Sequence, residues 1–169
     1  MLVSDLCSFM RGNRPLKTSA FLTKPPYIFI TETWCSQAVS DSELNIQNYQ
    51  FYRCDRETKQ ECGCFIYDLD TLKTNKVEDS VLNSLPELVW ISINNNSLLL
   101  GCIYGAPDSS DNVNDLIINA FIHAPALSYN AKVITGGFNY HGINWNIVTD
   151  GYDKFVMAQE MALNASFIH

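Results

Sequence analysis

Apolar and polar residues follow one another along this chain in short runs, and the lengths of these runs are typical of β-strands. The densest run, residues 27–31, reads Tyr-Ile-Phe-Ile-Thr and predicts a buried strand, because β-branched and aromatic side chains favour extended backbone. Similar runs predict further strands over residues 50–54, 62–67, 88–93 and 98–104. The last two flank the sequence Asn-Asn-Asn-Ser at 94–97, which predicts a hairpin with a polar loop.

After residue 104 the spacing of apolar residues becomes helical. The apolar positions recur at i, i+3, i+4, i+7 and i+8, and they are Val113, Leu116, Ile117, Ala120 and Phe121. Ser109 and Ser110 offer hydroxyl groups to cap the start of this helix, and Pro125 is expected to end it. The sequence therefore predicts an amphipathic helix between these limits.

Two more elements are predicted beyond this helix. Residues 131–135 form a β-branched run, and we expect this strand to break at Gly136-Gly137. Residues 152–164 are expected to form a last helix, because Phe155, Ala158 and Met161 lie on one side of it. Strands joined by hairpins and followed by helix, strand and helix indicate a mixed α/β fold.

The length of 169 residues fits one domain. Residues 1–26 show little periodicity and end in Pro25-Pro26, so we interpret them as a weakly anchored lead-in with room for a short helix. The domain itself is assigned to residues 27–169. This interpretation includes no strand in the lead-in.

The composition is that of a folded globular protein, with 47% hydrophobic and 17% charged residues. No apolar run approaches the roughly 18 residues of a membrane span, and no basic segment opens a signal peptide, so we expect an intracellular protein with no membrane partner. The six cysteines contain no C-x-x-C pair, and we interpret them as thiols that pack as small hydrophobic residues.

The net charge of −7 is unevenly distributed. Residues 1–26 hold four bases and one acid, which leaves 7 bases and 17 acids in the rest of the chain, a net charge of −10 there. Lys and Arg supply most of the affinity of non-specific nucleic-acid binding. The acidic body of the protein therefore predicts weak binding to DNA.

Polar residues follow several of the predicted strands. Glu32 follows the first dense strand, Tyr104 ends the second strand of the hairpin, and Asn139 comes four residues after the strand at 131–135. Because α/β scaffolds present ligand-binding groups at strand ends, these three residues are candidates for one site.

A series of short sequences in a fixed order adds to this expectation. They are Thr31-Glu32-Thr33-Trp34, Asp41-Ser42-Glu43-Leu44, Tyr52-Arg53-x-Asp55-Arg56, Gly101-Cys102-Ile103-Tyr104, and Gly136-Gly137-Phe138-Asn139 with Ile143-x-Trp145. This series, which extends over about residues 27–165, resembles the endonuclease domain of non-LTR retrotransposons within the endonuclease/exonuclease/phosphatase superfamily.

The resemblance implies a four-layer α/β sandwich that nicks DNA with the help of Mg²⁺. It implies that Glu32 binds the metal, that Tyr104 forms a hydrogen bond near the scissile phosphate, and that Asn139 orients phosphate or water. Mg²⁺ prefers carboxylate oxygen and retains water, so a glutamate suits this role. DNA is the partner that the resemblance implies, and the oligomeric state is left open.

The departures from the family pattern predict little or no activity. Gly137 stands where the family has the aspartate that activates water, and Gly105 stands where an arginine usually follows the tyrosine. The opening asparagine has no match, since Asn13 is too close to Glu32, and the closing aspartate–histidine pair would come after residue 169. We therefore expect a truncated sandwich, incomplete at both ends. His141 and His169 are interpreted as a loop and a terminal residue, and not as catalytic replacements.

Two other functions remain open from the sequence. The chain is also compatible with another phosphoesterase of the same superfamily, which would act on phosphoesters other than genomic DNA. It is also compatible with a non-catalytic remnant or binding module, which the glycine at position 137 favours.

Overall fold

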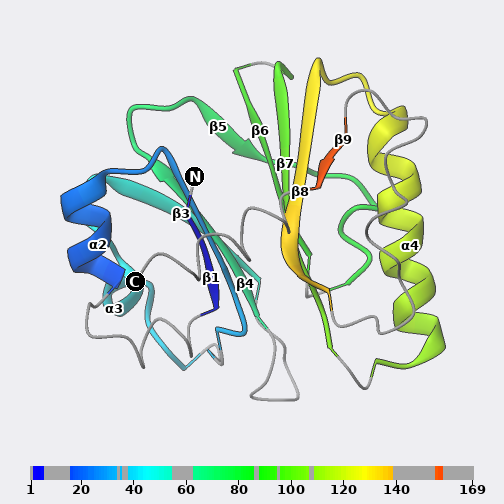
Figure 1. The fold of residues 1–169 in the computed structure, drawn as a ribbon, viewed down its shortest axis with the longest axis horizontal. Helices are drawn as coiled ribbons and strands as arrows, with labels where there is room; N and C mark the ends of the chain where they lie inside the picture. Colours follow the sequence, from blue (N-terminus) through cyan, green and yellow to red (C-terminus); the bar gives the residue numbers. More distant parts are fainter. Residues whose placement is uncertain are drawn as a thin grey trace.

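Two β-sheets pack face to face in the computed structural model, with helices on the outer side of each sheet (Figure 1). The structure describes residues 2–5, 16–33, 35, 38–54, 63–85, 88–94, 96–106, 109–138 and 155–157. Helix, sheet, sheet and helix follow one another as four layers. The predicted α/β sandwich is therefore confirmed.

The first sheet has four strands in the order β1-β2-β4-β3. These strands are β1 (Leu2–Asp5), β2 (Tyr27–Thr31), β3 (Tyr49–Cys54) and β4 (Cys64–Leu69). β1 is parallel to β2, whereas β4 is antiparallel to both β2 and β3. Helix α2 (Leu16–Thr23) covers the outer face of this sheet, with the short helix α3 (Asp41–Leu44) beside it.

The second sheet has five strands in the order β5-β6-β7-β8-β9. These strands are β5 (Thr74–Lys76), β6 (Leu88–Ile93), β7 (Leu98–Gly105), β8 (Ala131–Phe138) and β9 (Phe155–Met157). β5, β6 and β7 are antiparallel neighbours, and β7, β8 and β9 are parallel. Helix α4 (Asp111–Ala126) joins β7 to β8 and lies on the outer face of the sheet.

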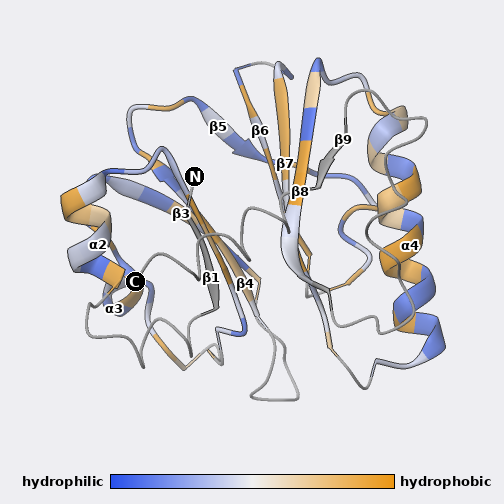
Figure 2. Cartoon of the chain, viewed as in Figure 1, coloured by the Kyte–Doolittle hydropathy of each residue, from blue (hydrophilic) through white to orange (hydrophobic). Residues whose placement is uncertain are grey.

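The buried hydrophobic residues that the structure describes form three clusters, one in each gap between layers. The cluster between the sheets includes Phe29, Ile66, Val89, Ile91 and Leu100. The cluster under α4 includes Trp90, Leu99, Ile103, Ile117 and Ala120, and the cluster under α2 includes Ala20, Ile28, Ile30 and Phe65. Figure 2 shows the resulting pattern, with hydrophobic residues along the central strands and mixed colours on the helices. Alternate side chains of each central strand therefore enter two different clusters.

Most of the strands expected from apolar runs are confirmed within one or two residues. The hairpin between β6 and β7 is also confirmed, and its loop residues Asn94 and Asn96 have positive φ values of 46° and 70°. Asparagine tolerates this left-handed conformation better than most residues, which explains its repeated use in the loop. The expected helix is confirmed as α4, which begins after Ser110 and ends one residue past Pro125. The expected capping by a serine hydroxyl is wrong for Ser110, whose side chain forms no capping hydrogen bond.

Three short strands were not predicted. β1 lies within residues 1–26, where no strand was expected, and it pairs with β2 over Leu2–Asp5. β5 is a polar three-residue strand paired with β6, and β9 pairs with β8 inside the segment 152–164 that was expected to be helical. The prediction of helix is wrong at Phe155–Met157, and the rest of that segment lies outside the described residues. Each of these strands forms because it pairs with a longer neighbouring strand, and its own residues give only a weak preference for extended backbone.

The expectation that β8 breaks at its two glycines is also wrong. The strand continues through Gly136 and Gly137 to Phe138, and it remains paired with β7 to the end. Gly136 has a φ of +151°, and a Cβ atom added there would lie 1.7 Å from the carbonyl oxygen of Ile103. Glycine is therefore what permits β8 to stay close to β7 at this point.

A buried polar network connects the two sheets at the end where β2 begins. The Asp68 side chain is fully buried, and its Oδ2 accepts hydrogen bonds from Gln50 Nε2 and Thr74 Oγ1, both at 2.8 Å. The Tyr52 hydroxyl lies 3.0 Å from the same Thr74 oxygen. Because Thr74 belongs to the second sheet, this carboxylate helps to fix the two sheets relative to each other.

Burial raises the pKa of Asp68 above its ordinary value of 3.8, although hydrogen bonds from Gln50 and Thr74 oppose this effect. The stabilising contribution of the protonated form is therefore complete below pH 3.8 and is lost as the pH rises through the raised value. We expect Asp68→Asn, which cannot ionise, to gain free energy of unfolding relative to the unmodified protein as the pH increases. Urea denaturation at several pH values measures this, with the exposed Asp70→Asn as the control. If the free energy of unfolding of the Asp68→Asn variant and that of the unmodified protein changed with pH in the same way, the expectation would be contradicted.

Candidate active site

The ends of three strands from both sheets meet at one edge of the sandwich. Tyr104 of β7 and Gly137 of β8 are direct partners in the parallel pairing. A Cβ atom added to Gly137 would lie 3.0 Å from Cδ2 of Tyr104 and 3.7 Å from the hydroxyl oxygen of Thr31, the last residue of β2. Glu32 directly follows Thr31. The structure thus brings Glu32, Tyr104 and Gly137 to a common rim.

Glu32 has an unusual backbone conformation at this rim. Its φ is +54°, in the left-handed region, and its side chain is partly exposed. A non-glycine residue in this region carries a backbone cost of about 1–2 kcal/mol. The neighbouring Thr33 donates its N–H to the carbonyl of Gly63 at 3.3 Å, which connects the segment after β2 to the start of β4. The chain is therefore held in a strained turn where the carboxylate leaves the sheet.

Tyr104 belongs both to the rim and to the core. Its side chain is 7% exposed and packs in the cluster between the two sheets. The edge of its ring lies over Gly137, where the Cδ2 and Cε2 atoms would be 3.0 Å and 3.2 Å from an added Cβ. These distances are shorter than ordinary van der Waals contact. Any side chain at position 137 would therefore displace the ring by a few tenths of an ångström.

Threonine hydroxyls surround the same place. Thr31, Thr33 and Thr135 are 5%, 2% and 0% exposed. Among the described residues, the Oγ1 atoms of Thr33 and Thr135 have no hydrogen-bond partner. Thr135 is two residues before Gly137 in β8, so both face the first sheet. Buried polar atoms are normally satisfied, so these two hydroxyls are free to bind water or a ligand.

Asp5 is a residue of this rim that sequence reasoning missed. The parallel pairing of β1 with β2 aligns Asp5 with Thr31, one residue before Glu32, and β1 also contacts β8. The available signal was a carboxylate directly after the apolar pair Leu2-Val3 and one serine. That run was too short to predict a strand on its own.

The remaining residues of the predicted site are placed less completely. Asn139 and the two histidines at 141 and 169 lie outside the described residues. Gly105 is the last residue of β7 and is buried. At position 137 the described backbone carries no side chain that accepts a proton. The part of the site that the structure describes is therefore Glu32, Tyr104, Gly137 and the backbone of Asp5.

Comparison with known proteins points to one fold. No protein-family profile matches the chain, and no curated protein sequence matches it. A solved structure of the endonuclease domain of TRAS1, a telomere-specific non-LTR retrotransposon, matches 96% of this chain and 66% of its own with a TM-score of 0.55 at 13% identity. The chain has the fold of the endonuclease/exonuclease/phosphatase superfamily.

Two further structures with this superfamily fold are similar to the chain. An AP endonuclease from Archaeoglobus fulgidus aligns with 75% of this chain and 52% of its own, with 12% identity and a TM-score of 0.50. A 3′ phosphatase from Neisseria, NExo, bound to a product DNA hairpin, aligns with 82% of this chain and 53% of its own, with 12% identity and a TM-score of 0.50. The chain thus spans between half and two thirds of the length of these structures.

The donor groups at this rim fit a hard divalent cation only in part. No group of three or more His, Cys, Asp or Glu side chains that could hold a metal occurs among the described residues. Mg²⁺ is often bound by one or two carboxylates together with water and substrate phosphate. Glu32 supplies one carboxylate, and the backbone of Asp5 pairs with that of Thr31, the residue before Glu32. A single carboxylate such as that of Glu32 is compatible with Mg²⁺ bound together with a phosphate.

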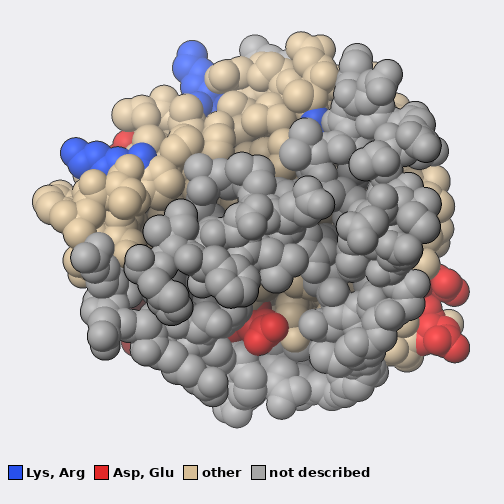
Figure 3. All heavy atoms as spheres, viewed as in Figure 1, with Lys and Arg blue, Asp and Glu red and all other residues tan. Residues whose placement is uncertain are grey.

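The charge on the face drawn in Figure 3 is mixed. Basic side chains lie at the upper left, towards α2 and β5, and acidic ones lie beside the lower end of α4 and near the centre of the view. Within the described part of the chain, no helix is both long enough and apolar enough to span a membrane.

Proposed function

We propose that this protein is a metal-dependent DNA endonuclease in ancestry that has lost the hydrolytic step. The fold of DNA endonucleases and phosphatases supports the first part of this proposal. The observation that carries the second part is the contact between the Tyr104 ring and Gly137, at the rim where Glu32 emerges. The ring edge lies 3.0 Å from the position that the Cβ atom of a side chain at 137 would take.

Phosphodiester hydrolysis needs three contributions. A metal neutralises the phosphate, a base activates the attacking water, and hydrogen-bond donors stabilise the developing charge. Glu32 would hold Mg²⁺, which supplies the neutralisation when bound, and Tyr104 and Asn139 would bind or orient the phosphate. Gly137 supplies no base. Because a positioned general base contributes about 10²- to 10⁴-fold to a rate, hydrolysis without it is slow.

The proposed substrate is DNA, bound weakly. The matched structures are named for action on DNA or for a bound DNA hairpin, and this is the reason for choosing DNA over other phosphoesters. The net charge of −7 opposes binding to a polyanion. DNA that did bind would depend on Glu32-bound metal and would dissociate readily at moderate salt.

A plasmid-nicking assay tests the proposal. We expect the purified chain with Mg²⁺ to leave supercoiled plasmid intact under conditions in which an intact endonuclease of this superfamily nicks it. The Glu32→Ala variant is expected to behave identically, and Glu78→Ala, at an exposed position away from the rim, is the matched control. Metal-dependent nicking that Glu32→Ala abolishes and Glu78→Ala retains would overturn the proposal.

The restoring substitution provides a further arm of the same assay. Gly137→Asp returns a carboxylate to the rim, but its Cβ would press on the Tyr104 ring at 3.0 Å. We therefore expect little nicking from Gly137→Asp alone.

A second phosphoesterase function remains open, because a 3′ phosphatase shares the fold. Release of phosphate from 3′-phosphorylated oligonucleotides, without plasmid nicking, would favour it. Metal-dependent retention of an oligonucleotide without hydrolysis would favour a binding module.

A further inference from the structure

The large hydrophobic side chains that are most exposed in the described part of the chain lie on two helices. Phe21 and Leu22 on α2 are 68% and 61% exposed, and Ile118 and Ile122 on α4 are 50% and 68% exposed. The two helices form the opposite outer layers of the sandwich (Figure 1). Exposed apolar groups on such a face are candidates for an interaction surface where they lie together with a groove or with complementary charge.

The α2 face is basic. Lys17 precedes Phe21 by one helical turn, and Lys24 directly follows the helix; both lysines are exposed. The Lys17 ammonium donates to the carbonyl oxygen of Glu43 at 3.0 Å, which holds it beside the helix. Of the nearby acids, Asp41 pairs with Arg53 at 2.8 Å, whereas the Glu43 carboxylate accepts hydrogen bonds from Ser40 and keeps its negative charge.

The α4 face is acidic. Asp111, Asp115, Ile118 and Ile122 follow one another at i, i+4, i+7 and i+11, so they share one side of the helix. Both aspartates are exposed. The acidic part of this stripe is in the first half of the helix and the apolar part is in the second half. Its charge is therefore opposite to that of α2, while its apolar content is similar.

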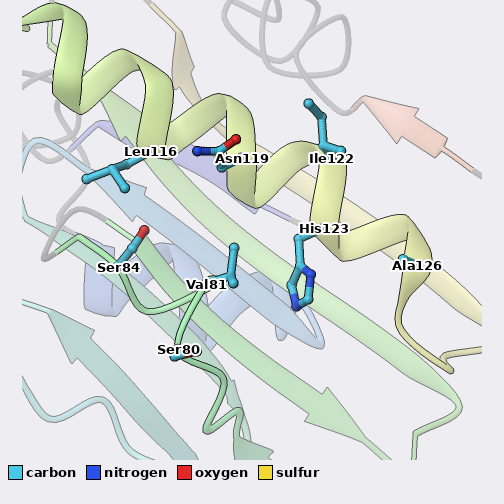
Figure 4. A pocket seen from close by; sticks show the side chains of 8 residues that line it. All are labelled: Ser80, Val81, Ser84, Leu116, Asn119, Ile122, His123 and Ala126. Atoms are coloured by element: carbon cyan, nitrogen blue, oxygen red, sulfur yellow. The ribbon is translucent and has the colours of Figure 1, made fainter.

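A groove borders the apolar half of the α4 stripe (Figure 4). It has a volume of about 550 Å³, and its apolar lining includes Val81, Leu116, Ile122 and Ala126. The wall opposite α4 is fixed by Asp79, which accepts the N–H groups of Val81 and Leu82 at 2.9 Å through Oδ1. Its Oδ2 lies 3.0 Å from Nε2 of His123 on α4. The groove is thus preformed and wide enough for an aromatic side chain.

We propose that α2 of one copy of this chain docks on the α4 face of a second copy. Phe21 enters the groove beside Ile122, and Lys17 lies towards Asp115. Lys24 and Asp111 are too far apart along the helices for a contact and add only a long-range attraction of opposite charges. The α2 face has the exposed aromatic side chain and the basic charges. The α4 face has the groove and the acidic charges, so α2 complements α4 but neither face complements itself. The contact is therefore heterologous, and it leaves a free α2 and a free α4 at the two ends of any assembly.

The contact is weak because its smaller partner is short. α2 has eight residues and is about 12 Å long. A helix of this length buries less surface than the roughly 1,600 Å² of a standard protein–protein interface. Association is consequently visible only at high protein concentration. Because ions screen exposed charges, it is strongest at low salt.

Sedimentation velocity of the full chain tests the first part of the proposal. The expected result is a weight-average mass that rises with protein concentration beyond that of a dimer and falls when salt is added. Non-specific hydrophobic aggregation has the opposite salt dependence, so it is distinguished by the same experiment. A monomer at every concentration and at low salt would overturn the proposal.

Charge reversal tests which faces meet. One variant carries Lys17→Glu with Lys24→Glu, and the other carries Asp111→Lys with Asp115→Lys. Each variant alone is expected to be monomeric, because its two helical faces then have the same sign of charge. An equimolar mixture is expected to associate again, since the reversed α2 of one variant complements the reversed α4 of the other.

The matched control is Lys73→Glu with Lys76→Glu, which makes the same charge change at exposed positions away from both helices. It should associate like the unmodified protein. Phe21→Gln, which keeps the charges, should raise the protein concentration needed for association at least tenfold. Association that survives either charge reversal alone, or a mixture that remains monomeric, would contradict the assignment of α2 to α4. None of the substituted residues belongs to the candidate active site.

Discussion

Gly136→Ala is expected to lower the free energy of unfolding by about 4 kcal/mol, the sum of two separate penalties. The first is the backbone: φ at this residue is +151°, a conformation that alanine rarely adopts. The second is space, because the new methyl group would lie 1.7 Å from the carbonyl oxygen of Ile103. Backbone cannot rotate away as a side chain can, so β8 must separate from β7 near the rim.

Thermal and urea unfolding of the purified variant measure this effect. For a chain of this size the change corresponds to a fall in Tm of about 10 °C. Gly137→Ala is the matched control, since its nearest contact is the edge of the Tyr104 ring at 3.0 Å and not backbone. We expect it to cost about 1 kcal/mol, because an aromatic ring shifts more easily than a strand. Equal stabilities of the two alanine variants would contradict the role assigned to Gly136.

Trp90→Ala is expected to lower the free energy of unfolding by about 3–5 kcal/mol, the usual cost of removing a buried indole. Trp90 is fully buried between the second sheet and α4. Its cross-strand partner in β7 is Gly101, and a Cβ added to that glycine would lie 2.4 Å from the indole Cζ3 atom. The glycine thus leaves the room that the indole fills.

A double-mutant cycle separates this pairing from ordinary cavity formation. Gly101→Ala alone should cost about 1–3 kcal/mol through overpacking. In the Trp90→Ala background the same change should cost less, because the clashing ring is gone. Urea denaturation of the four proteins gives the coupling energy. Simple additivity would mean that the indole and the glycine do not depend on each other. Leu88→Ala, at another buried site in the same cluster, is the reference for cavity cost alone.

The long strands could be predicted from the sequence because each is a run of apolar residues long enough to be recognised without its neighbours. The run at 27–31 is apolar at its covered positions except Thr31, and the covered positions of 88–93 and 98–104 carry no polar side chain apart from Tyr104. β1, β5 and β9 were not predicted, since three or four residues carry too little pattern of their own. They exist because a long neighbour offers unpaired backbone groups. Sequence reasoning also interpreted paired glycines as a break, although here they permit close approach.

The residues of the candidate site that lie at the ends of long strands could be predicted from the sequence. Glu32 and Tyr104 follow or end such strands, and the structure places them at one rim with Gly137. Asp5 was not predictable, because its position depends on the pairing of β1 with β2 across more than twenty residues. The contact of the Tyr104 ring with Gly137 could not be predicted either, since it depends on the exact register of β7 and β8.

The core clusters determine which parts of the rim are able to change. Tyr104 belongs to the cluster between the sheets, whereas Glu32 and Gly137 belong to none of the three clusters. A substitution at position 32 or 137 therefore changes the polar groups of the rim without removing a side chain from any of these clusters. A substitution at position 104 would instead take an aromatic ring out of the core between the sheets. The chemistry of the rim and the stability of the fold thus depend largely on different residues.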